Sequence, residues 1–224
     1  MLALVVDSST PAVTAGLVRL GPDGLDVLAQ RVTVDARAHG ELLTPQLAAV
    51  LAESGVRAAE LDAVVAGLGP GPFTSLRVGL VTAATMGQAL DAPTYGVCSL
   101  DALAHAADDG RPLLVATDAR RREVYWALYE HGRPVTAPAV TAPAVAADAA
   151  RLRGAAFAVG EGAHRYADVL DLPVRDQPLY PPVASLAALV ADRIRAGAPR
   201  ETLTPLYLRR PDAVAAADRK SVLQ

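Results

Sequence analysis

The chain has 224 residues and a formal net charge of −3, with a sequence pI near 5.8, a balance that argues against a general nucleic-acid binder. Its one cysteine excludes an intramolecular disulfide and a cysteine-based zinc site. No signal peptide is recognised, and no apolar run approaches the roughly 20 residues that span a bilayer. We therefore expect a soluble, cytoplasmic protein of one large domain or two small lobes that does not enter a membrane.

The first half of the chain predicts the element order βββαβα. Apolar or alternating runs, the second and third separated by a Gly-Pro-Asp-Gly turn, predict strands at residues 2–6, 13–17, 25–34 and 63–66. A helix over about 41–54 is expected to end with Gly55 at its C′ position. Pro45 either kinks this helix or occupies its N1 position behind a Thr44 cap. A short strand at 94–97 and a helix at 100–107, capped by Ser99, complete this half.

A loop rich in glycine and proline follows the strand at 63–66. Residues 69–72 read Gly-Pro-Gly-Pro, and a helix capped by Thr74 or Ser75 then runs to Leu90. In such a strand–turn–helix, free backbone N–H groups point toward one place, which suits an anion. The alternative is that the segment only joins a strand to a helix. It matches neither common nucleotide-binding glycine pattern. The candidate nucleotide or anion loop comprises Asp7, Thr10, Gly69, Gly71, Thr74 and Ser75.

The second half repeats the pattern of the first. A buried strand at 113–117 ends in Asp118, as the first strand of the chain ends in Asp7. Further strands are predicted at residues 123–129, 134–140 (weakly), 156–159 and 205–208. Helices are predicted at residues 146–152, 165–170 and 185–196. This duplication predicts an α/β protein of the ribonuclease-H-like, actin-like ATPase fold, with lobes at 1–103 and 104–210 and a tail at 211–224 that is a helix or disordered.

Five segments carry a resemblance to one family. They are residues 4–10 (LVVDSST), 69–79 (GPGPFTSLRVG), 95–103 (YGVCSLDAL), 117–125 (TDARRREVY) and 205–209 (PLYLR). The chain resembles the bacterial tRNA threonylcarbamoyladenosine biosynthesis subunit TsaB, also called YeaZ, of the glycoprotease-like superfamily, from Met1 to about Arg210. Two positions depart from the family pattern, because Pro72 replaces a serine and Ser75 a glycine. Pro72 also removes an N–H donor from the loop.

The resemblance implies a protein without catalysis of its own. Members of this family pair with the catalytic paralogue TsaD, to which the ATPase TsaE also binds, and the complex modifies the adenosine next to the anticodon. The resemblance further implies a homodimer when the paralogue is absent, contact with tRNA only through the complex, and a nucleotide (ADP or ATP) only at the partner interface. The paralogue carries His-x-x-x-His where this chain has Ser99 and Leu103, which cannot hold a metal.

The resemblance also implies a partner surface on the two helices at 41–54 and 74–90. Each helix needs one apolar stripe for its own core, so a partner requires a second. The candidate interface residues are His39, Leu42, Gln46, Ala49, Arg77, Val78, Val81, Ala84, Thr85 and Gln88. An ordinary mixed surface is the alternative for any one of them.

Several polar residues have two readings at this stage. Asp7 either helps to hold a metal–nucleotide, as in actin-like ATPases, or accepts the amide of Ser9 or Thr10 in an Asx-turn. The arginines at 120–122 either touch tRNA phosphate or a partner carboxylate, or form a solvated hairpin turn. One rival function is a small ATPase or kinase that uses Asp7 and the loop at 69–75. A metallopeptidase is a further rival, which would require stoichiometric bound zinc.

Overall fold

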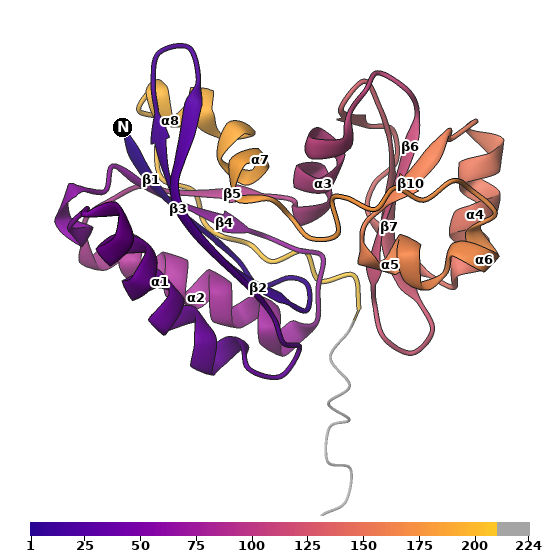
Figure 1. The fold of residues 1–224 in the computed structure, drawn as a ribbon, viewed down its shortest axis with the longest axis horizontal. Helices are drawn as coiled ribbons and strands as arrows, with labels where there is room; N and C mark the ends of the chain where they lie inside the picture. The colour runs from indigo at the N-terminus through magenta and orange to yellow at the C-terminus, as the bar shows by residue number, and fades with distance from the viewer. Residues whose placement is uncertain (210–224) are drawn as a thin grey trace, which may run out of the picture.

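The computed structural model describes residues 1–209, which form two lobes side by side (Figure 1). The predicted tail at 211–224 lies outside the described residues. The first lobe contains a five-stranded sheet in the order β3-β2-β1-β4-β5. Its strands are β1 (Leu2–Asp7), β2 (Ala12–Leu20), β3 (Leu25–Val34), β4 (Ala63–Gly67) and β5 (Thr94–Val97). β1 pairs antiparallel with β2 and parallel with β4, so the carboxyl ends of β1, β4 and β5 meet at one edge.

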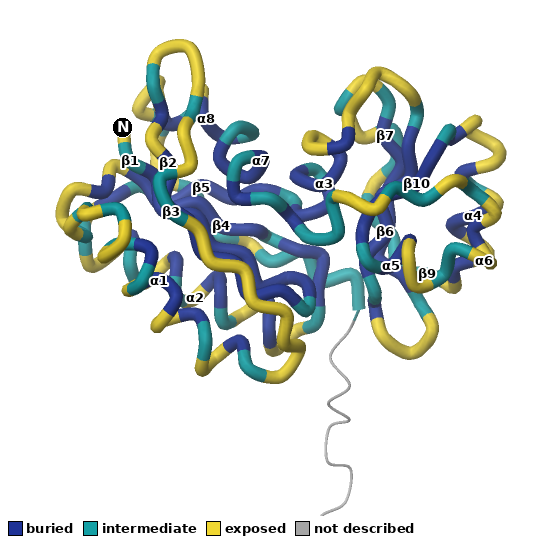
Figure 2. Tube along the Cα trace, viewed as in Figure 1, coloured by how far each residue is buried: buried dark blue, intermediate teal, exposed yellow. Residues whose placement is uncertain are grey.

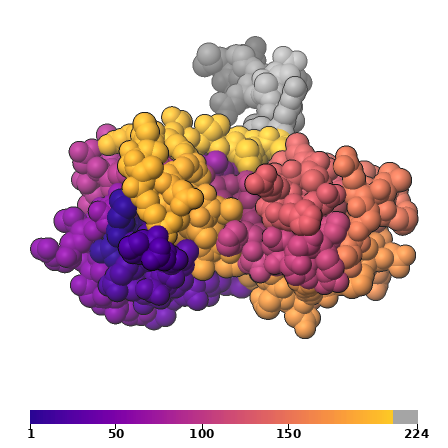
Figure 3. Space-filling model, turned by 90° about the horizontal axis from the view of Figure 1, so that it is seen from above, coloured from indigo at the N-terminus to yellow at the C-terminus, as the bar shows by residue number. Residues whose placement is uncertain are grey.

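Helices cover both faces of the first sheet. On one face, α1 (His39–Ser54) and α2 (Phe73–Ala89) pack against alternate residues of β1, such as Leu4 and Val6. On the other face, α7 (Val183–Ala188) and α8 (Ala191–Arg195) pack against Ala3 and Val5. Figure 3 shows these late residues, in orange, lying against the indigo N-terminal part of the chain. A short 3-10 helix, η1 (Ala58–Glu60), precedes β4.

The second lobe repeats the strand order of the first. Its sheet runs β10-β6-β7-β8, with β9 also paired to β7. The strands are β6 (Leu113–Asp118), β7 (Val124–Glu130), β8 (Arg133–Pro134), β9 (Ala139–Thr141) and β10 (Phe157–Val159). β6 pairs antiparallel with β7 and parallel with β10, as β1 does with β2 and β4. Val174 bridges Ala158 in parallel, at the place that β5 has in the first sheet. The duplicated fold predicted from the sequence is thereby confirmed.

The helices of the second lobe come from both sides of the predicted boundary at residue 103. One face of its sheet is covered by α4 (Pro143–Leu152), α5 (Glu161–Arg165) and α6 (Ala167–Leu170). The other face is covered by α3 (Ser99–Ala107), which lies between the lobes and also contacts α7. The packing therefore crosses the predicted boundary, because α3 lies on the second sheet and α7 and α8 on the first.

Several predicted elements differ from the structure. The weak strand at 134–140 is two short strands, and the helices at 165–170 and 185–196 are each broken in two. Residues 205–208 form no strand, although the Leu206 N–H donates to the Leu68 carbonyl. Pro45 lies inside α1, which begins at His39, so the prediction that it occupies the N1 position is wrong. Gly55 has the left-handed φ of 67° expected of a C′ glycine, as predicted.

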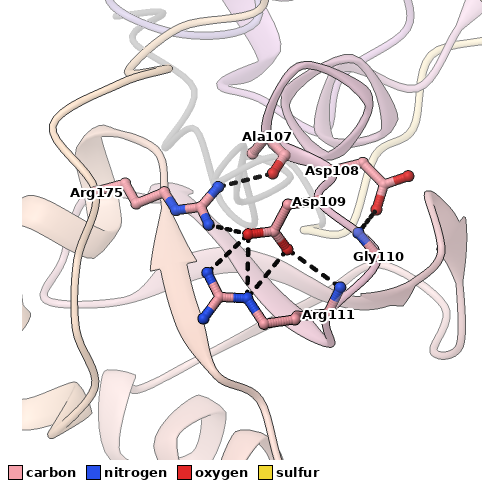
Figure 4. Close-up of polar contacts among 6 residues, drawn as sticks. All are labelled: Ala107, Asp108, Asp109, Gly110, Arg111 and Arg175. Carbon is pink, nitrogen blue, oxygen red and sulfur yellow. Dashed lines mark hydrogen bonds and ion pairs between the residues drawn. The ribbon is translucent and has the colours of Figure 1, made fainter.

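A cluster of charged side chains joins the end of α3 to the segment before α7 (Figure 4). Asp109 accepts hydrogen bonds from the guanidinium groups of Arg111 and Arg175, and Arg175 also donates to the Ala107 carbonyl at 2.9 Å. The Arg175 guanidinium lies 3.5 Å from the centre of the Phe157 ring. Arg111, followed by Arg175, holds the pKa of Asp109 well below its usual range.

Candidate functional site

Asp7, at the carboxyl end of β1, is buried and already bonded within the chain. Its Oδ1 accepts hydrogen bonds from the Ser9 amide at 3.0 Å and the Ser9 hydroxyl at 2.8 Å. Its Oδ2 accepts one from the Ser99 hydroxyl at 2.6 Å. Burial raises the pKa of Asp7, while these hydrogen bonds lower it. The Asx-turn to Ser9 is confirmed, and both carboxylate oxygens have partners inside the protein.

The glycines of the following loop allow close packing against the end of β1. A Cβ at Gly67 would lie 1.7 Å from Asp7 Oδ2, and one at Gly71 would lie 2.3 Å from the Ser9 carbonyl oxygen. Gly69 has a φ of +89°, and its N–H donates to the Ser99 hydroxyl. The loop therefore needs glycine in order to contact its own chain, independently of any ligand.

The start of α2 differs from the predicted cap. The N-cap residue is Pro72, which makes no side-chain hydrogen bond, so the predicted cap at Thr74 or Ser75 is wrong. The Ser8 hydroxyl bridges two backbone groups of α2. It accepts a hydrogen bond from the Gly79 N–H at 2.9 Å and donates one to the Ser75 carbonyl at 2.7 Å. These two backbone groups are four residues apart and would bond directly in a regular helix. Ser8 thus fixes α2 to the end of β1.

Two adjoining cavities lie between the lobes, at the carboxyl end of β1. One has a volume of about 420 Å³ and the other about 470 Å³. Their walls share residues from the 36–39 loop, the start of α2 and the 120–121 turn. Of the predicted anion-loop residues, Gly71, Thr74 and Ser75 line the first cavity and Thr10 and Ser75 the second. Asp7 and Gly69 line neither.

The second lobe has a carboxylate pair at the position equivalent to Asp7. The Asp118 amide donates to both carboxylate oxygens of Glu161, at 3.0 and 2.9 Å. Arg165 forms an ion pair with Asp118 at 3.1 Å. Burial raises the pKa of Glu161 to about 8. The sequence analysis singled out Asp118 but missed Glu161. The position of Glu161, directly after a strand and Gly160, could have identified it as a candidate.

The predicted interface residues divide into buried and exposed groups. His39 and Gln46 are buried, and they bond to the Thr10 carbonyl and the Thr33 hydroxyl, each at 2.8 Å. They therefore lie inside the chain and not on a partner surface. Leu42, Ala49 and Val78 are half-buried, whereas Arg77, Val81, Ala84, Thr85 and Gln88 are exposed.

The exposed residues other than Arg77 form a face that we call the α1/α2 face. Val81 is the exposed large apolar residue of this face, with 62% of its surface exposed. On the middle of α1, between residues 42 and 52, the exposed residues are Thr44, Pro45, Ala48 and Ala52, which the sequence analysis missed although they lie opposite the buried stripe. Residues 42–52 and 78–90 contain no charged side chain. Apart from Glu41, Glu53 and Arg77 near the helix ends, the outward side of this helix pair is therefore uncharged and built mostly from small residues.

Arg77 borders this face and is fixed by two aromatic side chains. Its Nε donates to the Tyr207 hydroxyl at 3.0 Å, and its guanidinium lies 4.1 Å from the centre of the Phe73 ring. The rings of Phe73 and Tyr207 have centroids 5.0 Å apart. These contacts bind the chain near residue 207 to the start of α2.

The duplicated lobes define a protein of the actin-like ATPase class, and comparisons with known proteins place it further. A family model for TsaD, described as tRNA N6-adenosine threonylcarbamoyltransferase, matches residues 26–178, which is more than half of the chain. An uncharacterized Mycobacterium tuberculosis protein is 52% identical over 215 residues, which are 94% of this chain and 92% of the relative. The chain belongs to the TsaD family.

Named relatives and a solved structure indicate the TsaB (YeaZ) group within this family. The Escherichia coli tRNA threonylcarbamoyladenosine biosynthesis protein TsaB is 32% identical over 133 residues, which are 58% of this chain and 55% of the relative. The solved structure of YeaZ from Pseudomonas aeruginosa has a TM-score of 0.73 at 27% identity. That comparison covers 92% of this chain and 99% of the solved chain. Within residues 1–209, no helix is both long and apolar enough to cross a membrane.

Proposed function

We propose that this chain acts in tRNA threonylcarbamoyladenosine biosynthesis as the non-catalytic partner of a TsaD-type paralogue. The α1/α2 face carries the proposal, because it is an uncharged surface centred on Val81, whose side chain is 62% exposed. Figure 2 shows exposed residues along the outer side of α1 and α2, below the buried strands of the first sheet. A matching helix pair of the paralogue packs on this face and forms a four-helix interface.

The residues at the paralogue's metal-binding positions support a role without catalysis. Ser99 is buried and bonded to Asp7, and Leu103 is buried in the core of the second lobe. Neither side chain offers an imidazole to a metal. Asp7 itself has no oxygen without a partner, which argues against the rival function as an ATPase or kinase. The chain instead holds TsaD in its competent form and completes the surface to which TsaE binds, and it meets tRNA only through the complex.

The same face explains the expected behaviour of the chain alone. An exposed apolar helix pair is stabilised by a second copy when the paralogue is absent. We therefore expect a symmetric homodimer through the α1/α2 face, which exchanges for the heterodimer when TsaD is added. The two assemblies exclude each other because both cover Val81.

Light scattering on mixtures of purified chain and its cognate TsaD tests the proposal. Wild-type chain is expected to give the mass of a complex with equal numbers of each subunit. Val81→Arg places a charge in the centre of the face and is expected to abolish both the homodimer and the complex. Val145→Arg is the matched control, because Val145 is 50% exposed on a helix of the other lobe. Equal binding by both variants, or no complex with wild type, would overturn the proposal.

A further inference from the structure

An extended segment after α8, residues 198–209, lies outside the two helices of the partner face. We call this segment the strap. In Figure 1 it is the yellow trace that leaves α8 and runs past the first sheet toward the second lobe. No helix or strand forms within residues 198–209, yet their bonds reach both lobes. The strap is therefore a connection between the lobes, in addition to the packing of α3 on α7.

The first half of the strap is bonded to β5, at the edge of the first sheet. The Glu201 N–H donates to the Thr94 carbonyl at 2.8 Å, and the Thr94 hydroxyl donates to the Glu201 carbonyl at 2.8 Å. The Glu201 carboxylate also accepts the Gly96 N–H at 3.1 Å and pairs with Arg193. These bonds cover an edge that would otherwise expose unpaired backbone groups. This half of the strap is therefore fixed to the first lobe.

The second half of the strap is bonded to α2, next to the α1/α2 face. The Leu206 N–H donates to the Leu68 carbonyl at 2.8 Å, and Tyr207 packs against the apolar cluster beneath α2. The Tyr207 hydroxyl accepts the Arg77 Nε–H at 3.0 Å, and its ring lies beside that of Phe73. Arg77 borders the face on which the paralogue is proposed to pack. A shift at the start of α2 therefore acts directly on the strap.

The last residue of the strap bonds to the second lobe. Arg209 donates to the Ala119 carbonyl at 2.8 Å and forms an ion pair with the Glu123 carboxylate. Ala119 and Glu123 are the two ends of the turn between β6 and β7, where the Ala119 N–H also donates to the Glu123 carbonyl at 2.9 Å. Only 26% of the Arg209 side chain is exposed, so water screens these charge-assisted bonds only in part. Arg209 thus bonds to both ends of one turn.

The turn that Arg209 holds has an unfavourable backbone conformation. Arg120, Arg121 and Arg122 have φ values of 58°, 53° and 61°. The left-handed region is costly for residues that carry a Cβ, and such residues normally occupy it singly. A strained conformation of this kind persists where the surrounding contacts hold it in place. The bonds from Arg209 to both ends of the turn are contacts of this kind, so the strap helps to fix the turn.

We propose that the strap couples the position of α2 in the first lobe to the conformation of the turn at 119–123 in the second. Arg77 of α2 bonds to Tyr207, and two residues farther along the strap Arg209 bonds to both ends of the turn. Contiguous bonded groups of this kind can carry coupling between distant sites. A paralogue on the α1/α2 face fixes the start of α2 and, through the strap, stabilises the turn. This input rests on the proposed partner role, whereas the connection itself belongs to the chain alone.

Amide hydrogen exchange at Ala119 and Glu123 tests the connection, because both N–H groups donate within the turn. Every sample of the isolated chain carries Val81→Arg, so that no second copy covers the α1/α2 face. Arg209→Gln should speed exchange at both amides by about tenfold or more. Tyr207→Phe removes only a hydroxyl that is bonded in the first lobe, and it should speed exchange at the same amides by about threefold or more.

Arg200→Gln is the matched control for these variants. It breaks an exposed ion pair between the same strap and Asp91 and should leave exchange at both turn amides unchanged. Exchange at the β1 amides is measured alongside, because a general loss of stability would speed exchange there as well. Equal exchange of the turn in the Tyr207→Phe and Arg200→Gln variants would overturn the proposal.

Cognate TsaD tests the input to the strap. Chain bound to TsaD should exchange at both turn amides about threefold or more slowly than the unbound Val81→Arg chain. The Arg209→Gln chain should form the same complex in light scattering but lose this difference. Equal slowing with Arg209→Gln would mean that TsaD contacts the turn directly, and no slowing in either chain would mean that α2 does not act on the turn; either result would overturn the proposal. Absence of any complex would instead contradict the partner role, and the comparison of isolated variants would still decide the connection.

Discussion

Replacing Glu161 by glutamine should change how the stability of the protein depends on pH. The Glu161 carboxylate is largely buried at the start of α5 and accepts the Asp118 amide through both oxygens. A glutamine at this position keeps an oxygen that can accept this amide but cannot ionise. The substitution therefore removes the charge while it retains the shape and one hydrogen bond.

The size and sign of the effect follow from the raised pKa. Burial raises the pKa of Glu161 from 4.5 to about 8 in the folded state. Between these values the folded state holds a proton that the unfolded state has lost, so stability falls as pH rises through this window. At about 1.4 kcal/mol per pKa unit, ionisation of Glu161 costs about 1 kcal/mol at pH 5 and about 5 kcal/mol at pH 9. The variant should escape this loss of about 4 kcal/mol, which is a large share of a typical folding free energy.

Urea unfolding of wild type and Glu161→Gln at pH 5, 7 and 9 measures the difference directly. The gap in unfolding free energy should widen with pH in favour of the variant. Asp168→Asn is the control, because Asp168 is an exposed carboxylate on α6 of the same lobe, and its curve should stay parallel to wild type. Parallel curves for wild type and Glu161→Gln would refute the reasoning.

Three further predictions concern packing and charge. Gly67→Ala places a Cβ 1.7 Å from Asp7 Oδ2 and should destabilise the fold by about 3 kcal/mol. Gly40→Ala, where nothing lies within 4 Å, should instead stabilise α1 by about 0.5–1 kcal/mol, and chemical unfolding of the two variants checks both signs. Ser8→Ala should cost about 1–3 kcal/mol and speed amide exchange at the start of α2, as hydrogen exchange would show; unchanged exchange there would contradict the bridging role. Asp109→Asn removes a carboxylate whose pKa is held low by two arginines. The stability that this carboxylate contributes above about pH 4, and loses at lower pH, should therefore be absent in the variant. The unfolding free energy of the variant should fall less steeply than that of wild type as pH is lowered from about 5 to about 2.

The strands were predictable where hydrophobic pattern alone decides them. The apolar runs of β1, β4 and β6 are buried on both faces, which leaves no polar alternation to misread. Residues 205–208 also form an apolar run, but their segment has no strand partner and bonds to Leu68 through one amide. Whether an apolar run becomes a strand therefore depends on a partner strand that is distant in sequence, which a local pattern does not reveal.

The site was predictable in part for a similar reason. Helical spacing shows which residues share a side of α1 but not which side faces inward. His39 and Gln46 share a side with apolar residues and were expected at a partner, yet they face Thr10 and Thr33, which are 29 and 13 residues away. Arg37 and Arg120, which line both interlobe cavities, are 83 positions apart in sequence, so only the folded chain brings them together.

The chain is proposed to support tRNA modification through its α1/α2 face without catalysing it alone. Reconstituted threonylcarbamoylation of tRNA with cognate TsaD and TsaE tests this claim most directly. Wild-type chain and Val145→Arg should both give product, whereas Val81→Arg and omission of the chain should give none. Equal product formation with Val81→Arg, or full activity without the chain, would contradict it.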